Sequence, residues 1–175
     1  MGWAFGLLIR FGAVGIDCYS FVEGSLMVRI INPMPISYDT IDVSWIIGRV
    51  IADVSFDSPS FWRFSLGAPE SIAVECLWRI VRAGRIVLTS QDHGQSFGLS
   101  APVDAARNAM EALLGVRVTN AQIWEATADL RISLGSELSL EIIPDSSGYE
   151  SWQLYAPTGR CYVAQGGGQL CTWTQ

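Results

Sequence analysis

Several residue types are scarce in this chain, and each shortage excludes a class of function. Its 175 residues include one histidine, His93, and no lysine at all. No two of the four cysteines form the CxxC pair that is typical of a zinc site. These cysteines are Cys18, Cys76, Cys161 and Cys171. We therefore expect no metal and no cofactor, and Cys161 and Cys171 either pair across a hairpin or remain buried thiols.

Charged residues are also scarce, at 16% of the chain, and acidic residues outnumber basic ones. The net charge is -6 and the isoelectric point is ≈ 4.6. Binding of nucleic acid requires a basic face, so this charge excludes nucleic acid as an expected partner. A basic protein would instead be attracted to the chain. The hydrophobic content of 50% argues against disorder and predicts a folded domain.

Long hydrophobic runs are missing, and a helix needs about 20 apolar residues to span a membrane. The apolar residues 1–15 lack a basic segment at their start and are interrupted by Arg10, unlike a secretory signal peptide. We therefore expect a cytoplasmic protein that does not bind membranes.

What the chain does contain is hydrophobic residues that alternate with polar ones, as in β-strands. Residues 1–31 show this pattern, with a tight turn predicted at 21–24. We expect residues 1–44 to form a β-hairpin extension packed on the rest of the chain. Residues 46–57 and 71–81 are each predicted to form one continuous strand.

The strand pattern is present twice, which predicts an internal duplication. Its units are expected at residues 45–100 and 116–175. We predict an α+β, mainly β fold, in which two antiparallel β units form one compact domain with pseudo-twofold symmetry. The matching segments are 61–67 (FWRFSLG) with 129–135 (DLRISLG), and 77–94 with 151–168.

Residues 102–114 predict a single α-helix, within a linking segment at 101–115. Its apolar residues recur at helical spacing, on one face. Ser100 is the predicted N-cap, Asp104 lies in the first turn, and Gly115 ends the helix.

Two motifs resemble catalytic or phosphate sites, and neither is complete. His93 lies beside Asp92 in a loop that also holds Ser90 and Ser96, which suggests a Ser-His-Asp constellation. Adjacent Asp and His side chains usually point apart, and no GxSxG motif is present, so a turn residue is favoured. The glycine run 166–168 lacks the Lys-Ser/Thr of a P-loop, which favours a turn with positive φ.

Three glutamates lie in or beside apolar strands, namely Glu75, Glu141 and Glu150. Glu75 and Glu141 fall at equivalent positions of the two units. Burial would raise the pKa of such a carboxyl, but strand alternation favours outward-facing side chains. If they face inward, Glu75, Arg79, Glu141 and Gln153 would line a small-ligand or catalytic pocket between the units.

Trp78 and Trp152 are also equivalent in the two units, which favours matched core positions over an interface role. The two loop-and-strand segments around them are nevertheless our predicted contact surface for a protein partner, since Trp and Tyr often anchor interfaces. The predicted contact residues are Asp92, His93, Gln95, Tyr149, Glu150, Trp152 and Gln153.

Several strings, among them DHGQSFG, PVDAA, SSGYESWQ and AQGGGQL, resemble an uncharacterised bacterial family of unknown function. The resemblance covers residues 45–175 and supplies no catalytic residues. Some small acidic bacterial proteins of this kind look like immunity proteins, which bind a toxin encoded by a neighbouring gene.

From these patterns we predict a cytoplasmic protein-binding domain without catalytic activity, which neutralises a cognate toxin or binds another basic protein. One alternative is the enzyme or small-ligand domain with the pocket described above. The other is a structural homodimer that uses an exposed strand edge. The sequence leaves open whether the protein is a monomer or a homodimer.

Overall fold

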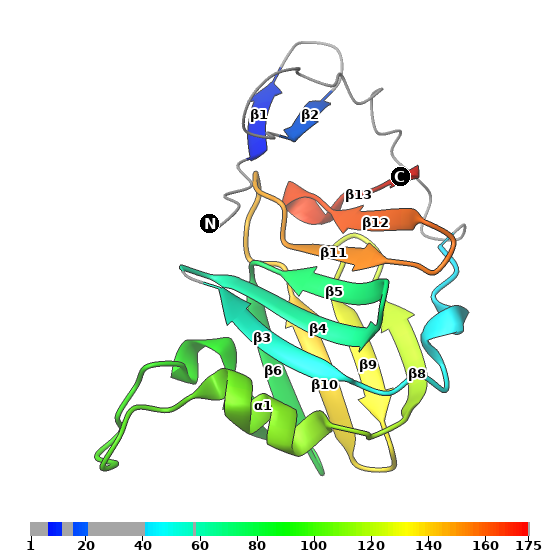
Figure 1. Cartoon of the computed structure of the whole chain (residues 1–175). Coiled ribbons are helices and arrows are strands. Elements are labelled where there is room, and N and C mark those ends of the chain that lie inside the picture. Colours follow the sequence, from blue (N-terminus) through cyan, green and yellow to red (C-terminus); the bar gives the residue numbers. More distant parts are fainter. Residues whose placement is uncertain (1–6, 12–15, 21–40, 58, 175) are drawn as a thin grey trace. The chain divides into compact units, whose positions relative to one another are not determined.

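The computed structural model describes residues 7–11, 16–20, 41–57 and 59–174 (Figure 1). The chain divides into two units, Met1–Pro35 and Ile36–Gln175. In the first unit, β1 (Leu7–Phe11) pairs antiparallel with β2 (Ile16–Ser20). The turn predicted at 21–24 lies outside the described residues.

The second unit contains two antiparallel sheets, which confirms the mainly β, α+β class. The six-stranded sheet has the order β13-β12-β11-β5-β4-β3, and the five-stranded sheet has the order β7-β6-β10-β9-β8. The first half of the unit forms β3 (Asp53–Asp57), β4 (Phe61–Gly67), β5 (Glu70–Val74), β6 (Leu77–Arg82) and β7 (Arg85–Thr89). The second half forms β8 (Val118–Ile123), β9 (Leu130–Leu134), β10 (Leu138–Ile143), β11 (Trp152–Tyr155), β12 (Arg160–Ala164) and β13 (Leu170–Thr174).

The strand orders of the two sheets correspond. If each strand is exchanged for its counterpart in the other half, β7-β6-β10-β9-β8 becomes β12-β11-β5-β4-β3. The registers agree as well, because Trp78 pairs with Ile142 while Trp152 pairs with Val74. This is the arrangement that a repeated unit predicts, and the duplication itself stays a prediction.

The registers correct one predicted equivalence. Arg131 pairs with Glu141 across the β9–β10 hairpin, and Arg63 pairs with Ala73 across the β4–β5 hairpin. The counterpart of Glu141 is therefore Ala73 and not Glu75, because strand pairing, rather than similarity of letters, determines which residues are equivalent.

One hydrophobic core lies between the sheets, whose strands cross at a steep angle in Figure 1. Trp78 and Trp152 are both fully buried in it, as predicted for matched core positions. The Trp62 and Trp78 rings meet edge to face, with centroids 4.9 Å apart. Aromatic pairs in this geometry contribute beyond their buried area.

The single α-helix of the described residues, α1 (Ala105–Leu113), begins three residues later than predicted. Asp104 is its N-cap, in place of Ser100, and accepts a hydrogen bond from the Arg107 backbone N–H (3.1 Å). The helix buries Ala105, Ala109 and Leu113 in the core. It packs against β3 and β7.

Two segments predicted as continuous strands are interrupted. The segment 46–57 begins at the last residue of the short 3-10 helix η2 (Ser44–Ile46), and β3 starts only at Asp53. Residues 71–81 divide into β5 and β6, because the chain crosses from one sheet to the other after Val74. A further short 3-10 helix, η3 (Ser90–Asp92), follows β7, and the tight turn η4 (Gly166–Gly168), in which Gly167 is not helical, follows β12. Within the described residues, no helix is both long and apolar enough to cross a membrane.

Candidate functional site

The chain between η3 and α1 projects from the second unit as loop 94–103, at the lower left of Figure 1. Two hydrogen bonds close its base. The Gly94 N–H donates to the Val103 carbonyl (2.9 Å), and the Val103 N–H donates to the Gln95 carbonyl (2.8 Å). The loop is therefore held at both ends although its tip extends into solvent.

His93 anchors this loop. Its ring lies 4.5 Å from the Phe56 ring and 5.4 Å from the Trp62 ring, measured between centroids. Its Nδ1 accepts a hydrogen bond from the Ala105 backbone N–H (3.2 Å), at the first residue of α1. His93 thus connects the β3–β4 hairpin to the start of the helix. These contacts account for a histidine at this position without any contact to a partner protein.

The Ser-His-Asp arrangement is not formed at this position. Nδ1 of His93 accepts the Ala105 hydrogen bond, so it cannot donate to a carboxylate. The Asp92 carboxylate instead accepts from the Thr89 backbone N–H (2.9 Å) in a capping box. Both side chains stabilise the local backbone, as expected for turn residues.

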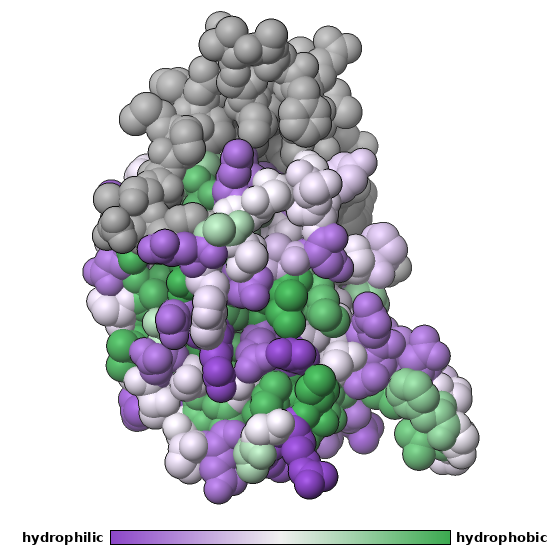
Figure 2. Space-filling view, turned by 180° about the vertical axis from the view of Figure 1, so that it is seen from behind, coloured by the Kyte–Doolittle hydropathy of each residue, from purple (hydrophilic) through white to green (hydrophobic). Residues whose placement is uncertain are grey.

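The tip of loop 94–103 exposes two large apolar side chains. Phe97 is 68% exposed and Leu99 is 60% exposed. Figure 2 shows hydrophobic residues on the lobe that projects at the lower right. Phe97 also has a φ of 45°, a left-handed conformation that is unfavourable for a bulky residue. Such strain often occurs at functional positions.

The second predicted contact segment is divided between surface and core. Tyr149 is 75% exposed, whereas Trp152 is 1% exposed and its Nε1 donates to the Ala128 carbonyl (2.8 Å). The prediction that Trp152 contacts a partner is therefore wrong, because strand alternation turns it into the core. Gln153 faces outward and its Nε2 donates to Glu150 Oε2 (2.9 Å).

The two predicted contact segments do not form one surface. Loop 94–103 lies at the lower left of Figure 1, whereas the segment 144–151 leads into β11 at the upper part of the same unit. The separation follows from the topology, since residues 92–95 follow the five-stranded sheet and residues 149–153 enter the six-stranded sheet.

Burial raises the pKa of the Glu150 carboxyl, and the nearby Glu75 carboxylate raises it further, while the hydrogen bond from Gln153 lowers it. Burial also raises the pKa of Glu75. Glu75 is nevertheless exposed, as the favoured outward-facing interpretation predicts, whereas Glu150 is half-buried. Within the described residues, no group of three or more potential metal-binding side chains lies together.

The glycine run is explained by close packing. Gly167 and Gly168 have φ values of 71° and 78°, so the predicted turn with positive φ is confirmed. A side chain on Gly168 would overlap the Ala126 carbonyl, and one on Gly166 would overlap the Gly148 backbone. The run therefore lets three backbone segments approach one another, which larger residues would prevent.

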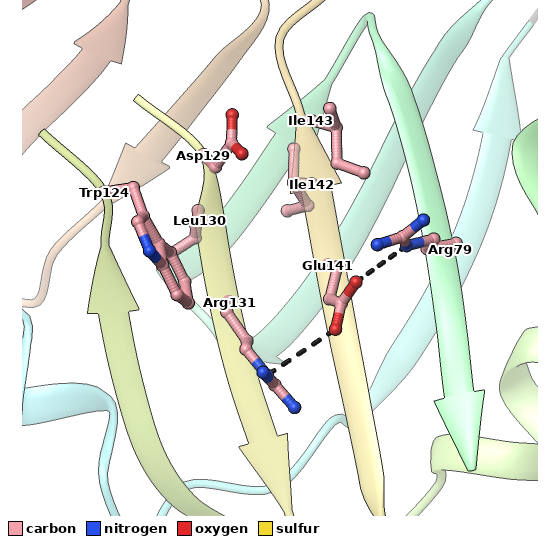
Figure 3. Close-up of a pocket in the computed structure, with 8 residues that line it drawn as sticks. All are labelled: Arg79, Trp124, Asp129, Leu130, Arg131, Glu141, Ile142 and Ile143. Atoms are coloured by element: carbon pink, nitrogen blue, oxygen red, sulfur yellow. Dashed lines mark hydrogen bonds and ion pairs between the residues drawn. The ribbon is translucent and has the colours of Figure 1, made fainter. Parts of the chain in front are cut away.

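A shallow pocket of ≈ 210 Å³ lies on the outer face of the five-stranded sheet (Figure 3). Neighbouring strands place Arg131, Glu141 and Arg79 side by side across its floor. Glu141 Oε2 lies 2.7 Å from Arg79 Nε, and its Oε1 lies 3.6 Å from Arg131 Nε. The lining residues are Arg79, Trp124, Asp129, Leu130, Arg131, Glu141, Ile142 and Ile143.

This pocket differs from the one that the sequence predicted between the two repeats, 45–100 and 116–175. Arg79 and Glu141 do meet, but on the outer face of the five-stranded sheet. Gln153 belongs to the six-stranded sheet, and Glu75 lies near Glu150 rather than Glu141. The prediction that these four side chains converge is therefore wrong, because Gln153 lies on a strand of the other sheet and Glu75 lies in the link between β5 and β6.

Sequence reasoning missed the residues that the structure brings forward. Phe97 and Leu99 are large apolar residues in a segment rich in glycine and serine, a composition that signals exposure. Glu141 was a named candidate, but its contact with Arg131 was missed. The two residues flank a tight hairpin turn, so counting across that turn would have paired them. No sequence pattern indicated that Trp124 is exposed, because its exposure follows from its place just after β8, an edge strand of the five-stranded sheet.

Residues 42–174 match the model of a protein family described as a family of unknown function (DUF6188). The chain belongs to this family. No curated protein and no solved structure matches the chain. The matched range includes both sheets of the second unit, α1 and loop 94–103, whereas β1 and β2 lie outside it.

Proposed function

We propose that this domain binds another protein through loop 94–103 and that it performs no chemistry of its own. The observation that supports this proposal is the exposure of Phe97 and Leu99 on a loop whose base is fixed. Full burial of a side chain of this size contributes roughly 1.5–3 kcal/mol. A loop that is already held in place also loses less conformational entropy on binding.

The chemistry of the partner follows from charge. A net charge of -6 favours association with a basic protein, so the partner proposed is one with an apolar groove and a basic rim. A bacterial toxin in a cytoplasmic toxin–immunity pair is the specific form of this proposal. Among the predicted contact residues, Gln95 lies on the loop and is exposed, which is consistent with a contact role.

A second candidate function is a structural homodimer. β7 is an edge strand of the five-stranded sheet, and it exposes Ile86 and Val87. Exposed apolar edge strands pair readily with a second strand. A dimer formed in this way would be disrupted by Val87→Lys, whereas binding through loop 94–103 would not require β7.

The test uses the tagged full-length protein as bait in an extract of its source cell. We expect the double variant Phe97→Ser/Leu99→Ser to lose at least about tenfold of the captured partner, since two apolar side chains no longer become buried. Tyr149→Ser is the matched control, because Tyr149 is at least as exposed as Phe97 and Leu99 but lies on another loop.

Thermal melting of each variant checks that the fold is retained. Capture that is unchanged in the folded double variant would contradict the proposal. Loss of capture in Tyr149→Ser alone would transfer the contact surface to the segment before β11. Light scattering of the wild type and Val87→Lys decides the homodimer candidate.

A further inference from the structure

We propose that the pocket on the outer face of the five-stranded sheet binds the carboxylate of an amino-acid-sized ligand. Arg79 and Arg131 would hold the carboxylate above Glu141, and Trp124 would pack against the apolar part of the ligand (Figure 3). This inference is independent of loop 94–103, because it rests on residues of other elements.

The first argument is the depth of the three charged groups. The Glu141 side chain is 15% exposed, against 36% for Arg79 and 47% for Arg131. Glu141 Oε1 also accepts a hydrogen bond from Ser139 Oγ (3.2 Å), which holds the carboxylate low on the sheet. A ligand that approaches from solvent therefore meets the guanidinium groups before it meets Glu141.

The second argument is the excess of donors over acceptors in this row. Each guanidinium has five N–H donors, and the contacts with Glu141 engage the Nε of each arginine. Two positive charges are balanced by one negative charge within the row. A carboxylate bound at the terminal nitrogen atoms would restore neutrality and form charge-assisted hydrogen bonds in the bidentate geometry that arginine favours.

The third argument is the composition of the pocket beyond this row. Trp124 and Asp129 face each other just beyond the ends of β8 and β9, where the Trp124 backbone N–H donates to the Asp129 backbone carbonyl (2.8 Å). In Figure 3 Asp129 lies at the opposite end of the lining residues from Arg131, and its carboxylate points away from Glu141. The pocket thus presents arginine at one end, a carboxylate at the other and an aromatic wall beside them.

The positions of the charged groups in the pocket indicate which class of ligand it would bind. A ligand with a carboxylate and an apolar side chain fits the arginine row and Trp124. An ammonium group on the same ligand would face Asp129. The volume of ≈ 210 Å³ is below the roughly 300–1,000 Å³ of pockets for drug-sized molecules, so the ligand is small. Free amino acids and the carboxyl terminus of a protein chain share this chemistry.

The experiment titrates the full chain with three probes and follows the indole N–H signal of Trp124 by nuclear magnetic resonance. The probes are phenylalanine, N-acetylphenylalanine and phenylalaninamide. We expect the two carboxylates to shift the signal and phenylalaninamide, which has no carboxylate, to leave it unchanged. Binding of phenylalanine alone identifies a free amino acid, whereas binding of N-acetylphenylalanine as well identifies a chain terminus as an acceptable source.

Variants then assign the contacts. Arg79→Gln and Arg131→Gln should each weaken carboxylate binding about tenfold, because a charge-assisted hydrogen bond is lost. Arg63→Gln, at the counterpart of Arg131 in the other sheet, should bind as the wild type does. Asp129→Asn should weaken phenylalanine but not N-acetylphenylalanine.

The proposal is overturned if neither carboxylate shifts the Trp124 signal at millimolar concentration. Equal binding of phenylalaninamide, or unchanged binding in both folded arginine variants, would also overturn it. Unfolding in urea, measured for each variant, separates loss of binding from loss of structure.

Discussion

The outer faces of the two sheets have the same strand arrangement but different chemistry. On the five-stranded sheet, Glu141 lies between Arg131 and Arg79 and contacts both. The counterpart positions on the six-stranded sheet are Ala73 between Arg63 and Gln153. One outer face therefore carries a row of ion pairs beside a pocket, whereas the other has an alanine at the central position.

The inner faces differ far less. Trp78 and Trp152 occupy counterpart positions, and both are fully buried. The residues two places further along, Ile80 and Leu154, are also both buried and apolar. The comparison teaches that packing between the sheets constrains the inward positions of both halves, while outward positions are free to differ. Function is therefore to be sought on the outer faces and in the loops.

The largest expected effect comes from the matched inward residues. Trp78→Ala and Trp152→Ala should each lower the free energy of unfolding by about 3–5 kcal/mol, because each leaves a cavity in the core. Urea unfolding of both variants measures the two losses. A loss of this size in only one variant would break the equivalence of the inward positions.

A smaller loss of stability should distinguish the segment that follows β12 from the segment that follows β7. Gly168→Ala should lower the free energy of unfolding by more than about 2 kcal/mol, since alanine is strained at positive φ and its Cβ overlaps the Ala126 carbonyl. Gly98→Ala is the matched control, because Gly98 has φ 79° but open space around it. Equal losses in thermal or urea unfolding would show that φ strain alone acts at both sites.

The smallest effect should come from making the outer faces alike. Glu141→Ala gives the five-stranded sheet the residue that Ala73 provides in the other sheet. We expect a loss of about 1 kcal/mol, because partly exposed ion pairs contribute little and the two arginines then repel each other. A double-mutant cycle with Arg79→Ala measures the coupling. A coupling of zero would show that the ion pair does not distinguish the two faces.

The sequence was sufficient for the features that depend on local patterns. Alternation located most strands, helical spacing located α1 to within three residues at its start, and the glycine run indicated positive φ. It was insufficient where the chain changes sheets, as between β5 and β6, since an unbroken apolar pattern is compatible with one strand or two. The same limit explains why Glu75 was aligned with Glu141.

The candidate sites show the same division. The sequence identified Arg79, Glu141 and the segment around His93 as notable, but it could not establish their contacts. His93 contacts Phe56 and Trp62 in the β3–β4 hairpin and the start of α1, which are two distant parts of the chain. Contacts of this kind depend on sheet pairing and on packing between layers, which no single segment encodes.

By itself, the sequence determined the β-rich class, the position of the helix and the acidic charge, because these follow from residue types and their spacing. The tertiary structure alone decided which residues face solvent and which meet across strands. It turned Trp152 into the core, left Phe97 and Leu99 on an anchored loop, and placed Arg131 beside Glu141. The physical reason is that strand register and the pairing of distant strands decide on which face each side chain lies.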